Sequence, residues 1–103
     1  MPVTSEISND GGTITIKVGG RFDFAVQNEF RDCYYNAVEE GKQTRFVIDM
    51  SNTNYMDSSA LGMLLMMREY LGGNSADISI VNCSADIKNI LTVANFQSLF
   101  NMA

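Results

Sequence analysis

The N-terminal part of the chain alternates between polar and apolar residues in two short segments, 3–7 and 13–18. In the second segment every other residue is apolar and β-branched, which is the period of a strand with one buried face. Between the segments lies Asn9-Asp10-Gly11-Gly12, a composition typical of a tight turn. The pattern predicts a β-hairpin that ends at Gly19-Gly20. The side chains expected to face the core are Ile14, Ile16 and Val18.

Residues 24–40 change to a helical period, with apolar residues at steps of three and four and charged residues between them. Gly41 follows, as is common at the end of a helix. Tyr34 and Tyr35 are adjacent, so we expect only one of them to point inward. The predicted inward positions are Val26, Phe30, Cys33 or Tyr34, Ala37 and Val38.

Residues 45–50 form an almost continuous apolar run, which predicts an interior strand covered on both faces, near the middle of the sheet. Residues 76–81 alternate enough to predict a further strand. Ser84 is expected to cap a helix that starts at Ala85, and the last residues to form a short strand or turn. The apolar side chains expected to pack in this C-terminal part are Ile87, Ile90, Leu91, Phe96, Leu99 and Phe100.

The spacing of apolar residues over 58–71 predicts a central helix that ends at Gly72-Gly73. At about 100° per residue, its apolar arc is wider than the roughly 100° stripe needed to pack on a sheet. Burial and exposure are both open for Leu61 and Leu65. We expect Met63 and Met66 to form a contact surface, because flexible thioethers suit surfaces that pack against a partner. The expected middle of the buried face is Ala60, Leu64, Met67 and Leu71.

These elements run in the order strand, strand, helix, strand, helix, strand, helix, short strand. Such alternation predicts an α/β fold in which an N-terminal hairpin joins a mostly parallel sheet with helices packed against it. The 103 residues, 46% of them hydrophobic, suffice for one compact domain and are too few for two. We therefore predict one domain over residues 1–103.

The charge and composition exclude several classes of function. A net charge of −5 opposes direct binding to nucleic acid. The longest apolar run, 60–67, is far shorter than the roughly 20 residues that span a bilayer, and the N-terminus lacks the regions of a signal peptide. We therefore expect a cytoplasmic protein without membrane insertion.

The chemistry-bearing residues do not suggest catalysis. The chain has no histidine, and its two cysteines, Cys33 and Cys83, are 50 positions apart, so they offer no zinc pair. In a cytoplasmic setting a disulfide is not expected, and both cysteines are interpreted as small buried side chains. We predict no catalytic residue, no metal site and no cofactor.

The start of the central helix is the most informative stretch. The short oxygen-bearing side chains of Asp57, Ser58 and Ser59 can accept hydrogen bonds from the free N–H groups of the first turn. A serine at that place lies at the positive end of the helix dipole, where an added phosphate is electrostatically favoured. We expect Ser58 at the surface and Ser59 tucked into the first turn.

Asp57-Ser58-Ser59-Ala60-Leu61-Gly62, preceded by Asn54-Tyr55-Met56, resembles the signature of anti-sigma factor antagonists, the bacterial branch of the STAS domains. Gly20-Arg21-Phe22-Asp23 falls where that family has a glycine, an acidic residue, an apolar residue and an aspartate. Two positions depart from the pattern: Ala60 replaces a glycine, which adds a methyl group where a partner would approach, and Arg21 replaces a glutamate.

The resemblance implies that Ser58 is phosphorylated by a kinase-like regulator that is itself the anti-sigma factor. The unphosphorylated form would bind this regulator and free a sigma factor, and a serine phosphatase would remove the phosphate. The partner-binding residues expected on this basis are Asp23, Asp57, Ser58, Ser59, Ala60, Gly62, Met63 and Met66.

Two other functions stay open. A STAS subunit of a membrane transport complex would use the same helix for docking without regulated phosphorylation. A phosphoryl receiver would use Asp57 or Asp49 at a strand end, although that chemistry normally needs further acidic residues to hold a metal ion.

Overall fold

The computed structural model describes residues 2–8, 11–40 and 45–102. The predicted turn at Asn9-Asp10 and the predicted helix end at Gly41 lie outside these ranges. The strands are β1 (Val3–Ile7), β2 (Thr13–Val18), β3 (Gly20–Phe22), β4 (Arg45–Asp49), β5 (Thr53–Met56), β6 (Ile78–Val81) and β7 (Asn101–Met102). The α-helices are α1 (Gln27–Glu40), α2 (Ser58–Tyr70) and α3 (Ala85–Val93), and the short 3-10 turns are η1 (Phe24–Val26), η2 (Gly73–Ser75) and η3 (Phe96–Ser98).

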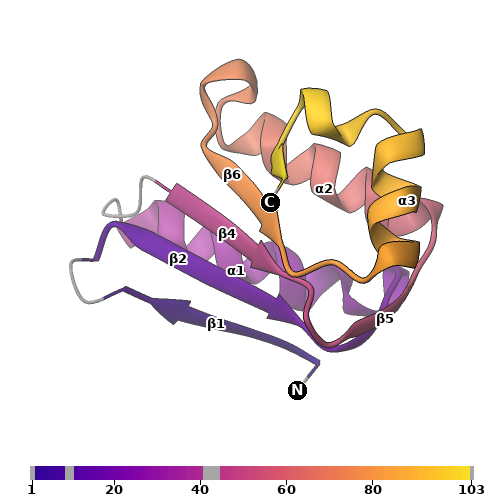
Figure 1. The fold of residues 1–103 in the computed structure, drawn as a ribbon. Helices are drawn as coiled ribbons and strands as arrows, with labels where there is room; N and C mark the ends of the chain where they lie inside the picture. Colours follow the sequence, from indigo (N-terminus) through magenta and orange to yellow (C-terminus); the bar gives the residue numbers. More distant parts are fainter. Residues whose placement is uncertain (1, 9–10, 41–44, 103) are drawn as a thin grey trace.

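The main sheet has the strand order β1-β2-β4-β6-β7 (Figure 1). β1 and β2 form the predicted antiparallel hairpin, and the remaining neighbours pair in parallel. Parallel neighbours need crossover connections, which α1 supplies between β2 and β4, α2 between β4 and β6, and α3 between β6 and β7. The predicted α/β architecture, with β4 as the middle strand, is confirmed.

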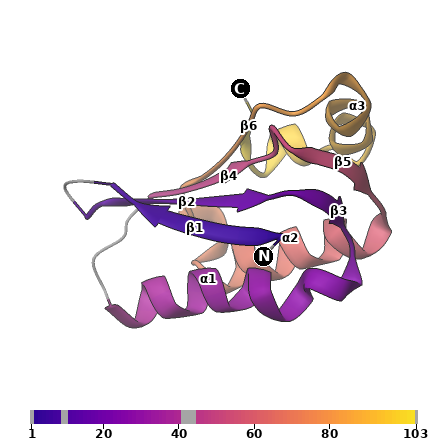
Figure 2. The ribbon, with the colours of Figure 1, turned by 90° about the horizontal axis from the view of Figure 1, so that it is seen from below.

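One face of the sheet carries the core. Ile16, Ile48 and Ile80 lie in register across β2, β4 and β6, and all three are fully buried. Figure 2 shows α1 and α2 below the sheet and α3 on the other side, beside β5. On the opposite face of β4, Val47 lies between Thr15 and Ser79 and is only partly buried. The prediction that residues 45–50 are covered on both faces is therefore wrong.

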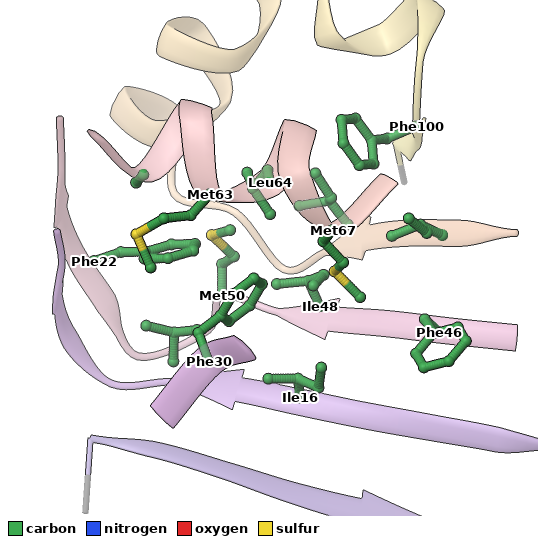
Figure 3. Close-up of a cluster of buried hydrophobic side chains, with 14 of the residues drawn as sticks. Ile16, Phe22, Phe30, Phe46, Ile48, Met50, Met63, Leu64, Met67 and Phe100 are labelled. Atoms are coloured by element: carbon green, nitrogen blue, oxygen red, sulfur yellow. The ribbon is translucent and has the colours of Figure 1, made fainter. Parts of the chain in front are cut away.

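The inward face of α2 packs directly on the middle of the sheet. Leu64 and Met67 point towards Ile48 and Met50, and Met63 points towards Phe22 (Figure 3). Leu64 and Met67 are fully buried, and Met63 is 5% exposed. The prediction that Met63 forms an exposed contact surface is wrong, because the buried arc of α2 is turned towards Met63 and away from Leu71, which is only partly buried.

A second, two-stranded sheet pairs β3 with β5 in parallel. The sequence pattern indicated only a strand end at Gly19-Gly20 and no strand at residues 53–56. The backbone N–H of Gly20, a residue with φ of 77°, donates to the carbonyl of Asn52 at 2.8 Å. The buried hydroxyl of Thr53 donates to the carbonyl of Val18. These long-range bonds bring β3 beside the segment that leads into α2.

The helices otherwise follow the predicted pattern, with one change at the start of α1. Asp23 caps the 3-10 turn η1 through the backbone N–H of Ala25 at 3.0 Å, and the α-helix begins only at Gln27. Ser84 caps α3 as predicted, accepting from the N–H of Ile87 at 3.3 Å. Gly72, with φ of 115°, follows α2 in the left-handed conformation that glycine tolerates.

Most of the side chains that were predicted to face the core are buried in the structure. Tyr34 is buried and Tyr35 is exposed, so one of the two adjacent rings points inward. Cys33 and Cys83 are free thiols that are only partly buried, and this burial raises the pKa of both. Of the other predicted core residues, those buried are Val26, Phe30, Ala37, Ile87, Leu91, Phe96 and Phe100, whereas Ile90 is partly buried and Val38 and Leu99 are exposed.

Replacing Leu64 by alanine should lower the free energy of unfolding by roughly 2–5 kcal/mol, because it removes a fully buried side chain and leaves a cavity. Urea unfolding followed by circular dichroism measures this loss. Leu65→Ala, one position along α2 and 39% exposed, is the matched control and should cost less than about 1 kcal/mol. Equal losses for the two variants would contradict the orientation of α2.

Candidate functional site

The candidate site is the start of α2, where Asp57 organises the first helical turn. One carboxylate oxygen of Asp57, Oδ1, accepts from the backbone N–H groups of Ser59 at 3.0 Å and Ala60 at 3.3 Å. The same oxygen accepts from the hydroxyl of Ser59. Asp57 is therefore the N-cap residue, and Ser59 is tied to it, as the sequence predicted for the second serine.

Several charges and dipoles act on the Asp57 carboxyl. The hydrogen bond from the Ser59 hydroxyl is the largest influence, and the N–H groups of Ala60 and Ser59 and the positive charge of Arg21 act in the same direction. Together they hold the pKa of Asp57 below its ordinary value despite partial desolvation. Asp57 is thus a fixed negative charge that faces the helix N-terminus.

Ser58 differs from Ser59 in both exposure and bonding. Its side chain is exposed, and its hydroxyl makes no hydrogen bond within the described part of the chain. The preceding carboxylate is directed at Ser59 and at the helix backbone. Of the two serines, Ser58 is the one whose hydroxyl an approaching protein can reach without breaking the cap.

Arg21 connects the β3–β5 sheet to this helix start. The strand register places Arg21 opposite Tyr55, and its guanidinium carbon lies 3.9 Å from the centre of the Tyr55 ring. Arg21 Nε also donates to Asp23 Oδ2 at 3.2 Å. Asp23 is thereby held at the same end of the molecule as Asp57, although the two residues are far apart in sequence.

The other predicted contact residues divide into two groups. Gly62 is exposed, and a Cβ atom added there would meet no atom within 4 Å, so this turn of α2 presents open surface. Met66 is 57% exposed, as expected of a contact residue. Ala60 is fully buried, and Met63 is 5% exposed at the bottom of a small pocket that Met66 also lines. The expectation that the Ala60 methyl group lies where a partner would approach is therefore wrong, because this side chain is fully buried.

The structure also shows exposed aromatic residues that the sequence reasoning did not select. Phe24 follows Asp23 directly and is 68% exposed, and Tyr55 is 38% exposed beneath Arg21. The apolar pattern over residues 24–40 predicts that Phe24 is part of the helix, whereas it lies in the 3-10 turn η1. The sequence does hold a signal for this position. Asp23 has a short side chain of the kind that caps a helix, so Phe24 would be the first residue after the cap.

The described residues suggest no metal centre and no membrane helix. They contain no group of three or more His, Cys, Asp or Glu side chains placed to hold a metal ion. In the described ranges, every helix is too short or too polar to span a bilayer. The site is thus defined by the capped helix start and the exposed residues around it.

Comparison with known proteins gives one matching family model and three similar proteins. The family model described as the STAS domain matches residues 4–103. A STAS-domain containing protein of Pseudomonas aeruginosa (strain UCBPP-PA14) is 44% identical over 103 residues, the full length of both chains. The anti-sigma factor antagonist SpoIIAA in its unphosphorylated form is 21% identical with a TM-score of 0.75, over 98% of this chain and 86% of that one. Bacillus SpoIIAA in its phosphorylated form is 19% identical with a TM-score of 0.74, over 98% and 90%.

The Asp57 charge should stabilise the fold above about pH 4, the ordinary pKa of aspartate. Because the folded state lowers this pKa, the contribution is lost as the pH falls through the lower folded-state value. Asparagine keeps the cap and removes the charge, so Asp57→Asn should melt at a lower temperature than the parent at pH 7. The difference should shrink towards pH 2, as measured by circular dichroism.

Asp32→Asn is the control for net charge, because it removes one exposed carboxylate away from the start of α2. If the difference in melting temperature between Asp57→Asn and the parent stayed constant across the acidic range, the electrostatic role of Asp57 would be contradicted.

Proposed function

Because the chain belongs to the STAS domain family, we propose that it is an anti-sigma factor antagonist. In this proposal the unphosphorylated protein binds an anti-sigma factor or related kinase-like regulator through the start of α2, and thereby frees a sigma factor. The solved proteins of the same fold that are described as anti-sigma factor antagonists support the proposal. Such a role in transcription would place the protein in the cytoplasm.

The observation that carries the proposal is the contrast between Ser58 and Ser59. Ser59 is bound to the capping carboxylate, whereas the exposed Ser58 hydroxyl makes no hydrogen bond among the described residues. A kinase can phosphorylate Ser58 without dismantling the cap. The existence of a phosphorylated form of SpoIIAA supports the same kind of modification in this chain.

Phosphorylation would change binding through local charge and bulk. A phosphate on Ser58 adds about −1.5 to −2 charges and three acceptor oxygens. The N-terminus of α2 favours that charge by roughly 0.3–1 kcal/mol, so the fold accepts it. A partner that binds this turn would remove water from the phosphate, and burying an unpaired charge costs free energy. The modification therefore acts on the interface and leaves the domain folded, and a serine phosphatase would reverse it.

The surface proposed for the regulator surrounds Ser58. It includes the carboxylates of Asp23 and Asp57, the open turn at Gly62, and the exposed side chains of Phe24 and Met66. Exposed apolar side chains flanked by polar groups are typical of protein-binding sites. Binding energy is expected to concentrate on the two apolar residues, because the carboxylates stay partly solvated.

We propose a binding function and not an enzymatic one. The carboxylate of Asp57 accepts from Ser59 and from the helix backbone, so it is not positioned to take a proton from Ser58. Asp49, the other aspartate considered for phosphoryl transfer, accepts from the N–H of Ser51 at 2.9 Å and the amide of Asn82 at 3.2 Å. Both aspartates are engaged in local structure.

Incubation with the cognate kinase and ATP should place phosphate on Ser58. The variant Ser58→Ala should accept none, because its exposed hydroxyl is absent, while Ser59→Ala should be phosphorylated like the parent. Phosphopeptide mapping by mass spectrometry measures both. Phosphate confined to Ser59 would overturn the assignment.

Capture from extracts of the native host should retain a kinase-like regulator on the Ser58→Ala protein and not on Ser58→Asp or Met66→Glu. Met66→Glu should weaken binding at least tenfold in titration calorimetry and change folding stability by about 0.5 kcal/mol or less. Ile7→Glu is the matched control, because Ile7 is 50% exposed at the far end of β1 and should leave binding unchanged. Capture of a transporter ATPase in place of the regulator would instead favour a transport subunit.

A further inference from the structure

A groove between α1 and α2 lies apart from Ser58, further along both helices. It has a volume of about 490 Å³, and Figure 2 shows the two helices side by side below the sheet. We call it the α1–α2 groove and define it by its lining residues, which are Tyr34, Tyr35, Leu65, Met66, Glu69 and Tyr70.

The floor of the groove is a cluster of tyrosine rings. Tyr35 from α1 stacks on Tyr70 from α2 with ring centres 4.3 Å apart, and the buried Tyr34 lies 5.3 Å and 5.7 Å from them. Tyr35 and Tyr70 are nevertheless 40% and 48% exposed. Together with the exposed Leu65 and Met66, they form a contiguous apolar patch of the kind that marks protein contacts.

Side chains of opposite charge lie at the groove: Glu69 lines it, and Arg31 lies just beyond its lining, beside Tyr35. Arg31 extends from α1, with its guanidinium carbon 5.6 Å from the centre of the Tyr35 ring. Its contact with the neighbouring Asp32 is 3.7 Å long and largely solvent-exposed, and such pairs contribute little. Glu69 extends from α2, and its carboxylate makes no ion pair within the ranges that the structure describes.

This arrangement is complementary to itself. α1 and α2 both connect parallel neighbours of the sheet, so they run in the same direction. Rotation by 180° about an axis along the groove places α1 of one copy over α2 of the other. Because Tyr35 and Tyr70 lie at the same level, Arg31 is then within about one helical turn of Glu69 of the second copy, which the two long side chains can span. The pair occurs twice because the interface is two-fold symmetric.

We propose that the α1–α2 groove is the dimer interface of this protein, occupied by the same groove of a second copy. The stacked rings supply a flat apolar centre, and the Arg31–Glu69 pairs at the rim set the register. A net charge of −5 opposes self-association, and pairing of opposite charges offsets that repulsion locally. The interface does not include Ser58, although it shares Met66 with the surface proposed for the regulator.

Sedimentation equilibrium of the purified full chain, over a wide concentration range in low salt, tests the proposal. The parent should form a dimer that weakens as salt is added. Arg31→Glu and Glu69→Arg should each raise the dissociation constant about tenfold, because each places two pairs of like charges across the axis. The double variant R31E/E69R should return the dissociation constant to within about threefold of the parent.

Two further variants test the apolar centre. Leu65→Glu should abolish the dimer, while Val93→Glu, at a 79% exposed residue of α3 away from the groove, should not affect it. Circular dichroism checks that each variant is folded. A parent that stays monomeric throughout, or a double variant that does not recover, overturns the proposal. If Leu65→Glu is unfolded, the charge reversals decide alone.

Discussion

The packing of α2 on the middle of the main sheet is the constraint on which the rest of the structure depends. Leu64 and Met67 are fully buried over Ile48 and Met50, and this contact fixes the rotation of the helix about its own axis. Once the rotation is fixed, Ser58 and Gly62 must face outward, because they lie roughly opposite the buried positions at about 100° per residue. Met66 lies on the flank of the buried face and is 57% exposed. A change in core packing would therefore displace the binding surface, although no core residue belongs to it.

The β3–β5 pair adds a second constraint, on the segment before α2. Hydrogen bonds from Gly20 to Asn52 and from Thr53 to Val18 fasten this segment to the end of β2. As a result, Arg21 lies over Tyr55 and near enough to Asp57 to lower its pKa. Its positive charge lies near Ser58, the position where phosphorylation would add negative charge.

The sequence predicted the elements that repeat a pattern over several residues. The hairpin, the central strand β4 and the helices α1, α2 and α3 follow from apolar periodicity, and Asp57, Ser84 and Gly72 mark helix ends through local chemistry. β3 and β5 were missed because such short strands carry no period, and their pairing depends on residues some thirty positions apart. Met63 was misplaced for a different reason, whereas Ala60 lies on the buried face as predicted. A helical pattern with too many apolar residues does not fix the direction of its buried face, and only contacts with Phe22 and the sheet decide it.

The excess of apolar residues on α2 explains how one helix can serve several contacts. Its buried face is complete with Ala60, Met63, Leu64 and Met67, so Leu65, Met66 and Tyr70 are not required for the core. Met66 and Tyr70 lie one turn apart in the C-terminal half of α2, where Tyr70 stacks with Tyr35. Met66 borders both proposed surfaces. A second copy seated in the α1–α2 groove would therefore cover part of the surface proposed for the regulator, and the two associations would compete for the same side chain.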